Sequence, residues 1–295
     1  FSSMENRIIT GHTGLTGLLG SPVSHSISPL MHNEAFRLLN LDYVYLCFDV
    51  GTDTLKTAVE GLKTIGIKGF NCTMPDKNLM CELCDELSPA ARMIGAVNTV
   101  LNDNGKLIGH NTDGVGYMRS VADAGFSIIG KKMTLLGAGG AAVSICTQAA
   151  LDGVSSIDIY NRPGKNYERA VALADTLNKE TSCQVNVYDI ADSKSLTDSI
   201  GESAILVNGT SLGMAPNTDT CPINDASVFH SGLIVSDIIY NPRETKLLSL
   251  AKAHGCSTFN GLYMLLYQGA EAFRIWTGTD MPVEPIKQKY FSENA

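Results

Sequence analysis

Short apolar runs alternate with longer helical patterns along almost the whole of this chain. Such alternation is typical of an α/β protein, in which helices connect parallel strands. The 295 residues, of which 44% are hydrophobic, suit two domains with packed cores better than one small domain. The predicted fold class is therefore α/β with two domains. Apolar runs are too short for a membrane-spanning helix, which needs about 18 or more residues, so no membrane partner is expected.

The apolar periodicity predicts the individual elements. In the first half, helices are expected over 29–39, 54–65 and 75–87, and strands over 17–19, 43–49 and 67–72, followed by a hairpin of 98–101 and 106–109. In the second half, helices are expected over 117–124, from the glycine-rich turn to 151, and over 245–254 and 261–276, and strands over 133–136, 156–160, 204–208 and 233–239. Gly255 is placed to cap the helix before it.

Charge and cysteine usage limit the partners and the compartment. The net charge is −8 and the basic residues are scattered, so no nucleic-acid partner is expected. The eight dispersed cysteines suit reduced thiols in the cytoplasm. Cys81 and Cys84 form a CxxC inside an expected helix, where packing is favoured over a metal or redox role because no second pair exists. Residues 1–3 do not resemble a signal peptide and are expected to precede a natural Met4.

A glycine-rich turn lies between an expected strand and an expected helix. Gly137, Gly139 and Ala142 fit the pattern G-x-G-x-x-A, and the strand 156–160 follows at the required spacing. Small residues let the backbone approach a pyrophosphate, and the helix N-terminus offers free N–H groups. A plain structural turn is the alternative. The order of strand, turn, helix and strand favours a Rossmann-type dinucleotide-binding domain. No metal site is expected.

Lys77 lies in the first turn of the helix expected after Pro75. A cation is disfavoured at this positive end of the helix dipole, which would also lower the pKa of the lysine. This placement indicates a functional lysine. The alternative is a solvated surface lysine whose charge Asp76 partly offsets.

The open end of the expected hairpin collects polar residues. Counting six residues outward from Asn104 gives Asn98, and six outward from Gly105 gives Asn111, with Asp113 just beyond. Three converging polar side chains favour a ligand site. An Asp-Gly turn or a helix cap is the alternative for Asp113.

Two further loops contain hydroxyl groups. In the loop 24–29, Ser28 before Pro29 is a ready N-cap, whereas Ser26 has no such explanation. The loop 208–214 follows a buried strand, where loops line the ligand crevice of such folds, and an ordinary connection is the alternative. His25 and His32 lack partners at metal-ligand spacing and are interpreted as structural.

Taken together, these motifs resemble those of the shikimate dehydrogenase family, including its quinate/shikimate dehydrogenase branch. The resemblance extends from Gly17 to about Pro285. The matching stretches follow one another in order: Ser24–Pro29, Asn71–Lys77, Gly95–Thr99, Asn111–Gly114, Gly137–Ala141, Asn208–Met214, Tyr240–Pro242 and Gln268–Gly269.

The resemblance implies a role for each matching position. Lys77 and Asp113 would form the catalytic pair. The substrate's hydroxyls and carboxylate would be held by Ser26, Ser28, Thr73, Asn98 and Gln268, with Tyr45 a weaker candidate. The pyrophosphate would bind at Gly137, Ala138, Gly139, Gly140 and Ala141, and the adenosine ribose near Asn161, Arg162, Pro163 and Gly164. The nicotinamide half would be surrounded by Thr210, Ser211, Met214, Ile238, Ile239, Tyr240 and Gly261.

The sequence departs from the family pattern at two places. Many relatives have histidine where this chain has Asp76, and an acid there could raise the pKa of Lys77. Relatives that use NADP usually continue Asn-Arg with threonine or serine, whereas Pro163 and Gly164 follow here. NAD is therefore the predicted preferred cofactor, with weaker use of NADP.

These observations predict a shikimate dehydrogenase that oxidises shikimate reversibly to 3-dehydroshikimate. Residues 4–113 and 261–295 would form the substrate domain and 114–260 the dinucleotide-binding domain, with the active site in the cleft between them. The alternatives are a quinate/shikimate dehydrogenase of broad specificity and a regulatory dinucleotide-binding module without turnover. A homodimer is one possible assembly.

Overall fold

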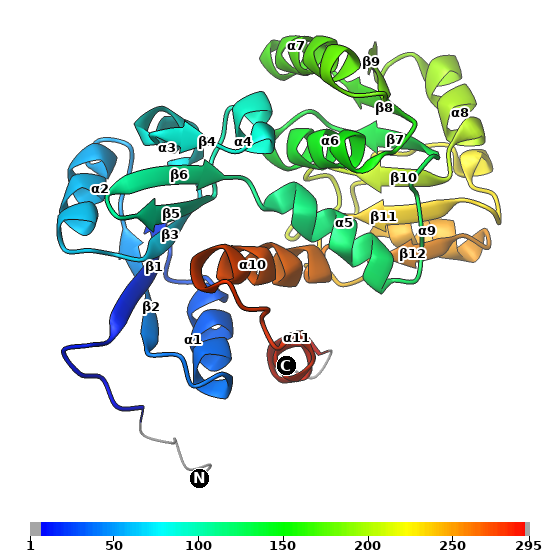
Figure 1. The fold of residues 1–295 in the computed structure, drawn as a ribbon. Coiled ribbons are helices and arrows are strands. Elements are labelled where there is room, and N and C mark those ends of the chain that lie inside the picture. The colour runs from blue at the N-terminus through cyan, green and yellow to red at the C-terminus, as the bar shows by residue number, and fades with distance from the viewer. Residues whose placement is uncertain (1–6, 293–295) are drawn as a thin grey trace. The chain divides into compact units, whose positions relative to one another are not determined.

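The computed structural model describes residues 7–292, so the expected start at Met4 lies outside the described residues. The described chain divides into two compact units, whose residues can be followed by colour in Figure 1. The first unit comprises the residues up to Thr112 and those from Gly269 onward, and the second runs from Asp113 to Gln268. The predicted extents of a substrate domain and a dinucleotide-binding domain stay predictions. No described helix is long and apolar enough to cross a membrane.

The first unit is built on a mixed six-stranded sheet in the order β2-β1-β3-β5-β6-β4. Its strands are β1 (Gly14–Gly20), β2 (Tyr43–Asp49), β3 (Gly69–Cys72), β4 (Glu86–Leu87), β5 (Thr99–Asp103) and β6 (Lys106–His110). Its helices are α1 (Ser28–Leu38), α2 (Leu55–Thr64), α3 (Lys77–Leu83), α4 (Pro89–Ile94) and α11 (Val283–Tyr290). Strands β1, β2 and β3 are parallel, and β5 and β6 form the antiparallel hairpin expected from the Asn-Gly turn.

The second unit is built on a parallel six-stranded sheet in the order β12-β11-β10-β7-β8-β9. Its strands are β7 (Lys132–Leu136), β8 (Ser156–Asn161), β9 (Gln184–Asp189), β10 (Ile205–Asn208), β11 (Ile234–Asp237) and β12 (Ser257–Phe259). Its helices are α5 (Asp113–Asp123), α6 (Gly140–Asp152), α7 (Lys165–Glu180), α8 (Ser193–Glu202), the short η1 (Ala226–Val228) and α9 (Lys246–Ala253). Helix α10 (Leu262–Thr277) passes from the second unit into the first.

This sheet reverses its strand order at β7, which lies between β8 and β10. Doubly wound sheets bind ligands at such a switch point, beside the carboxyl ends of the strands. The α/β fold class with a Rossmann-type domain is confirmed. Gly255 follows α9 with a φ of +85°, in the left-handed conformation that the cap requires.

Two predicted helices had the wrong limits. The helix expected over 75–87 ends at Leu83, because the next residues turn to pair with β6. The Asp85 N–H donates to the Leu107 carbonyl over 2.8 Å, and the Asp85 carboxylate accepts the Leu107 N–H over 2.7 Å. The helix expected over 117–124 begins four residues earlier, at Asp113. The early end of α3 comes from a contact distant in sequence that local periodicity does not contain.

His32 of α1 is fully buried in an aromatic cluster of the first unit. Its ring stacks on Tyr45 at a centroid distance of 4.6 Å and lies 5.1 Å from the Trp276 ring. Both ring nitrogens are buried and have no hydrogen-bond partner among the described residues. Burial lowers the pKa of His32 to about 3, because the charged imidazolium would lose its hydration there.

The buried imidazole should make the protein sensitive to acid. The unfolded chain takes up a proton at His32 below its ordinary pKa of 6.5, whereas the folded protein does not until about pH 3. The free energy of unfolding should therefore fall as the pH drops through this window, by about 2 kcal/mol at pH 5. Urea denaturation of the wild type and of His32→Phe at about pH 7.5 and pH 5 measures this. An equal pH dependence in both proteins would contradict the assignment.

Candidate functional site

A cavity of about 490 Å³ lies at the carboxyl ends of β7, β10 and β11 in the second unit. Three segments form it: the start of α6, the loop after β10 and the loop after β11. Its lining residues are Gly139, Gly140, Ala141, Gly209, Thr210, Ser211, Met214, Ala215, Ile238, Ile239, Tyr240 and Asn241. The lining is largely apolar with a few polar groups, as in most small-molecule sites.

The glycine-rich turn at this cavity has the geometry that an anion needs. Gly137 has a φ of +104° and donates its N–H to the Tyr160 carbonyl over 2.8 Å, which attaches the turn between β7 and α6 to the end of β8. A β-carbon on Gly139 or Gly140 would meet nothing within 4 Å, so open space lies in front of the backbone. The first N–H groups of α6 have no acceptor within the helix. These features fit a bound pyrophosphate.

The cavity gathers most of the residues predicted to meet the pyrophosphate and the nicotinamide half. Gly137 and the buried Ala138 belong to the glycine-rich turn but do not line the cavity, and Gly261 packs against Ile238 instead of lining it. Gly209, Ala215 and Asn241 line it although no role was predicted for them. Their signal was their position within the same two loops as the predicted residues. The roles of all these residues stay predictions.

The residues predicted to meet the adenosine ribose lie outside this cavity. Asn161 is the last residue of β8, and Arg162, Pro163 and Gly164 follow as exposed residues before α7. The Asn161 amide donates to the Arg162 carbonyl over 2.9 Å. Because the Gly137 N–H bonds to Tyr160, this segment flanks the glycine-rich turn. It is thus free to meet a ligand that extends beyond the cavity.

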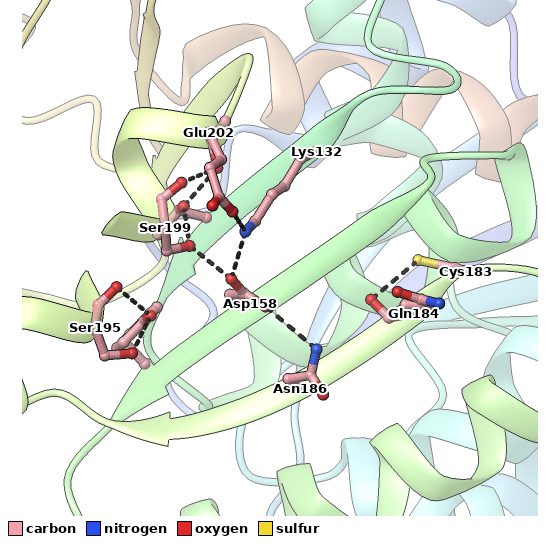
Figure 2. Close-up of polar contacts among 11 residues, drawn as sticks. Lys132, Asp158, Cys183, Gln184, Asn186, Ser195, Ser199 and Glu202 are labelled. Atoms are coloured by element: carbon pink, nitrogen blue, oxygen red, sulfur yellow. Dashed lines mark hydrogen bonds and ion pairs between the residues drawn. The ribbon is translucent and has the colours of Figure 1, made fainter. Parts of the chain in front are cut away.

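Asp158 is 21 residues past Gly137, near the spacing at which many dinucleotide-binding folds place an acid for the ribose. Its carboxylate instead pairs with Lys132 at 2.9 Å and accepts the Ser199 hydroxyl over 2.8 Å. Figure 2 shows Lys132, Ser199 and Glu202 gathered around it. Asp158 lies within the buried part of β8 and not at its end, and its contacts join β8 to α8.

In the first unit, buried polar side chains form a continuous chain of hydrogen bonds. The Tyr45 hydroxyl donates to Asn71 Oδ1 over 2.8 Å, and Asn71 Nδ2 donates to Thr99 Oγ1 over 3.0 Å. Thr99 Oγ1 donates to Asn98 Oδ1 over 3.1 Å, and Asn98 Nδ2 donates to Thr112 Oγ1 over 2.9 Å. Burial raises the pKa of Tyr45, which keeps its hydroxyl a donor.

This chain of hydrogen bonds connects two of the predicted substrate-binding residues, Tyr45 and Asn98. Satisfied buried networks fix the rotamers of their members. Asn71, Thr99 and Thr112 complete the chain, and no role was predicted for them because each bonds to a residue distant in sequence. The network could hold Tyr45 and Asn98 in place before a substrate arrives.

The serine loop differs from its predicted capping role. Helix α1 begins at Ser28 itself, so Ser28 is not its N-cap. Instead, the Ser26 side-chain oxygen accepts the Ser28 N–H over 3.1 Å. Ser26 therefore has the local structural explanation that the sequence did not supply, and Ser28 is a buried residue.

The predicted catalytic residues both begin helices. Lys77 is the half-buried first residue of α3 in the first unit, and Asp113 is the first residue of α5 in the second. Thr73 follows the end of β3, and its N–H donates to the Leu19 carbonyl over 2.9 Å. Gln268 lies in α10, where its side-chain amide donates to the Leu265 carbonyl over 2.9 Å. The pairing of Lys77 with Asp113 stays a prediction.

Asp76 and the CxxC cysteines surround this lysine in sequence. Asp76 is fully buried, and burial raises the pKa of its carboxyl. Burial also raises the pKa of Cys81 and Cys84, and Cys84 lies at the end of α3. Within residues 7–292 no group of three or more potential ligands could hold a metal.

Comparison with known proteins gives one consistent result. Residues 18–100 match the family model of the shikimate dehydrogenase substrate binding domain, and residues 261–289 match that of the shikimate 5'-dehydrogenase C-terminal domain. A shikimate dehydrogenase (NADP(+)) of Listeria monocytogenes is 50% identical over 98% of this chain and 100% of its own length. A quinate/shikimate dehydrogenase of Escherichia coli is 44% identical over 95% and 97%.

A solved structure is also similar. It is a shikimate 5-dehydrogenase of Listeria monocytogenes in complex with shikimate and NAD, with a TM-score of 0.93 and 50% identity over 96% of this chain and 98% of that one. Sequence and fold agree along almost the whole length. The chain belongs to the shikimate dehydrogenase family.

Proposed function

We propose that this chain is an NAD(P)-dependent dehydrogenase that oxidises shikimate reversibly to 3-dehydroshikimate. The observation that carries the proposal is the cavity at the switch point of the parallel sheet, with the open glycine-rich turn at its edge. The similar solved structure, which contains shikimate and NAD, supports the same ligands here. When bound, the nicotinamide supplies or accepts the hydride, and the protein supplies positioning and proton transfer.

The residues of this chain would divide the remaining work. In the reductive direction, Lys77 would donate a proton to the developing alkoxide oxygen, and Asp113 would orient Lys77 and accept a hydrogen bond from a ring hydroxyl. Tyr45 and Asn98, held by the buried network of the first unit, would bind further hydroxyl or carboxylate oxygens together with Ser26, Ser28, Thr73 and Gln268.

Steady-state turnover tests the function and its alternatives. Shikimate and quinate share a carboxylate and vicinal hydroxyls but differ at ring carbon one, and Ser26 and Ser28 are small donors that suit a carboxylate without crowding it. We expect kcat/KM to be higher for shikimate, with measurable turnover of quinate. A value for quinate about tenfold above that for shikimate would favour a quinate enzyme instead. Dinucleotide binding without turnover of either would favour a sensing module.

We propose NAD as the preferred cofactor, with weaker use of NADP. The exposed segment after β8 offers Arg162 to a 2′-phosphate, but Pro163 has no N–H and Gly164 has no side chain. The hydroxyl that would complete a phosphate site is therefore missing. Losing one charge-assisted hydrogen bond costs about 1.5–3 kcal/mol, or about tenfold or more in affinity. The relatives include proteins named for NADP and complexes with NAD, so both cofactors are used within the family.

Kinetics with both cofactors at saturating shikimate test this preference. The KM for NADP should exceed that for NAD by about tenfold or more. Pro163→Thr should narrow the difference by adding a hydroxyl beside Arg162. Position 164 is a poorer choice for a hydroxyl, since Gly164 has a φ of +148° that side chains rarely adopt. A wild-type KM for NADP below that for NAD would overturn the proposal.

A further inference from the structure

A buried carboxylate lies directly behind the dinucleotide cavity. Asp237 ends β11 and is fully buried, and Asn208 ends the neighbouring strand β10 at the paired position in the register. Asn208 Nδ2 donates to Asp237 Oδ1 over 3.2 Å. The two strand ends are therefore joined through their side chains as well as through the sheet.

Each of these residues also binds the loop that follows its own strand. Asp237 Oδ1 accepts the Ile239 N–H over 3.0 Å. Asn208 Oδ1 accepts both the N–H and the hydroxyl of Thr210, over 3.0 Å and 2.7 Å. Asn208 Nδ2 additionally donates to the Leu212 carbonyl over 3.2 Å. Both loops that line most of the cavity are thereby attached to one buried pair of side chains.

Two further contacts complete the arrangement. The Thr245 hydroxyl donates to the second carboxylate oxygen of Asp237 over 2.8 Å, from the N-cap of α9. The Ala215 N–H donates to the Asn241 carbonyl over 3.0 Å, which closes the two loops on each other. The donors to Asp237 are neutral groups, and burial raises the pKa of its carboxyl while these hydrogen bonds oppose the rise.

A buried carboxylate with neutral partners is costly, and an apolar side chain at the end of a strand would avoid that cost. The carboxylate is an acceptor only, and it accepts at the same time from the end of β10, from the loop after β11 and from the N-cap of α9. A carboxylate with these three hydrogen bonds favours one relative arrangement of the end of β10, the loop after β11 and the start of α9, which an apolar side chain cannot do. The arrangement determines where Thr210, Met214 and Ile238 stand around the cavity.

We propose that Asp237 is a positioning residue for the dinucleotide: with Asn208 and Thr245 it fixes the loops 209–215 and 238–241 and so sets the shape of the cavity that receives the cofactor. The inference rests on the proposed function, since the cavity must bind a dinucleotide. Asp237 would not touch the reacting atoms. Its loss should weaken cofactor binding and misplace the nicotinamide half, while binding of shikimate to residues of the first unit is unchanged.

Asp158 offers a matched control in the same sheet. It is a similarly buried carboxylate, 6% exposed, on β8, and it also binds hydroxyl groups of a neighbouring helix. It lines a different part of the surface and touches neither loop of the dinucleotide cavity. Asp158→Leu therefore measures how the loss of a buried, hydrogen-bonded carboxylate changes the free energy of unfolding without a change in the loops of the cavity.

The experiment compares Asp237→Leu, Asp237→Asn and Asp158→Leu with the wild type. Calorimetry with NAD and with NADP gives the Kd, kinetics give kcat and KM, and urea denaturation gives stability. We expect Asp237→Leu to raise the Kd by about tenfold or more and to lower kcat, because a misplacement of about 1 Å can cost about 100-fold in rate. Asp237→Asn should restore part of the cofactor affinity and part of kcat, since its amide oxygen can still accept the Ile239 N–H. Asp158→Leu should keep the wild-type Kd and kcat.

A wild-type Kd and kcat in folded Asp237→Leu would overturn the proposal, as would equal rises in Kd for the Asp237 and Asp158 variants. If Asp237→Leu does not fold, Thr245→Val removes one donor to the carboxylate with little change of shape, and an unchanged Kd in that variant would likewise overturn it. Failure of the proposed function is distinguishable, because it would appear as wild-type protein that does not turn over shikimate, whereas binding of the dinucleotide tests Asp237 without any substrate.

Discussion

Replacing Lys77 by alanine should lower kcat for shikimate by about 10²–10⁴-fold, the usual contribution of a general acid or base. The lysine is the first residue of α3, at the end of the helix where a cation is least favourable. This position, together with the family resemblance, motivates the predicted role of Lys77 in proton transfer.

The Lys77→Ala variant should remain folded. Lys77 contributes its backbone carbonyl to the structure by accepting the Val97 N–H over 2.9 Å, and this bond does not depend on the side chain. Alanine is also the best helix former. Circular dichroism and urea denaturation should therefore match the wild type while kcat falls. Lys56→Ala is a matched control, because Lys56 is an exposed lysine in the first turn of α2 in the same unit, and its kcat should not change.

Lys77→Arg distinguishes proton transfer from simple charge. Arginine keeps the positive charge but does not release a proton near neutral pH. If Lys77 acts as an acid, Lys77→Arg should be nearly as slow as Lys77→Ala. A folded Lys77→Ala with near-normal kcat would refute the catalytic role, and an arginine variant close to wild type would reduce that role to binding.

The elements that periodicity and turn chemistry specify were predictable from the sequence. The hairpin is the clearest case: counting outward from Asn104 and Gly105 placed Asn98 opposite Asn111, and the observed register pairs Thr99 with His110, the adjacent positions. The glycine-rich turn was likewise predictable, because only small residues allow the φ of +104° at Gly137 and the open space before Gly139. Both signals lie within a few consecutive residues.

The features that the sequence did not reveal depend on partners far along the chain. Helix α3 stops because Asp85 bonds to Leu107, and nothing near Leu83 indicates a stop. The spacing of Asp158 suggested a ribose contact, but the partner that decides its role is Lys132 at the start of the preceding strand. The sequence shows the chemical type of a side chain. The partners that this side chain contacts depend on how distant elements pack against its strand.

The difference between local and distant signals also explains why more of the residues that line the candidate cofactor site were predicted than of the residues that hold its loops in place. The loop 208–214 was predicted to line the crevice because it follows a buried strand, and the family resemblance implied roles for Thr210, Met214 and Ile238. No supporting role was predicted for Asn208 or Asp237, because their importance arises from their pairing across two strands. Lining residues follow from fold class, but supporting residues follow from register.

Gly261→Ala should disrupt the cofactor site strongly, lowering kcat/KM for the dinucleotide by about 100-fold, the effect that a misplacement of about 1 Å can have. Gly261 is buried immediately before α10, and its N–H donates to the Ile239 carbonyl over 3.1 Å. A β-carbon at this position would overlap the backbone of Ile238, including its carbonyl group. Since Ile238 lines the cavity, the backbone shift that relieves the overlap must change the cavity itself.

The β-carbon is held in place by the backbone of residue 261, and the atoms that it meets are backbone atoms of Ile238, so no side-chain rotation can relieve the clash. Overpacking of this kind lowers the free energy of unfolding by about 1–3 kcal/mol. Gly201→Ala is the control: Gly201 is exposed in α8, a β-carbon there meets nothing within 4 Å, and alanine should be neutral or stabilise the helix by up to about 1 kcal/mol. Calorimetry with NAD and urea denaturation of both variants separate the two effects. A folded Gly261→Ala protein with the wild-type dinucleotide Kd would show that the loop carrying Ile238 does not bound the cofactor site. The predicted loss requires the Kd to rise in Gly261→Ala and to stay unchanged in Gly201→Ala, because only the first substitution forces the backbone of a lining residue to move.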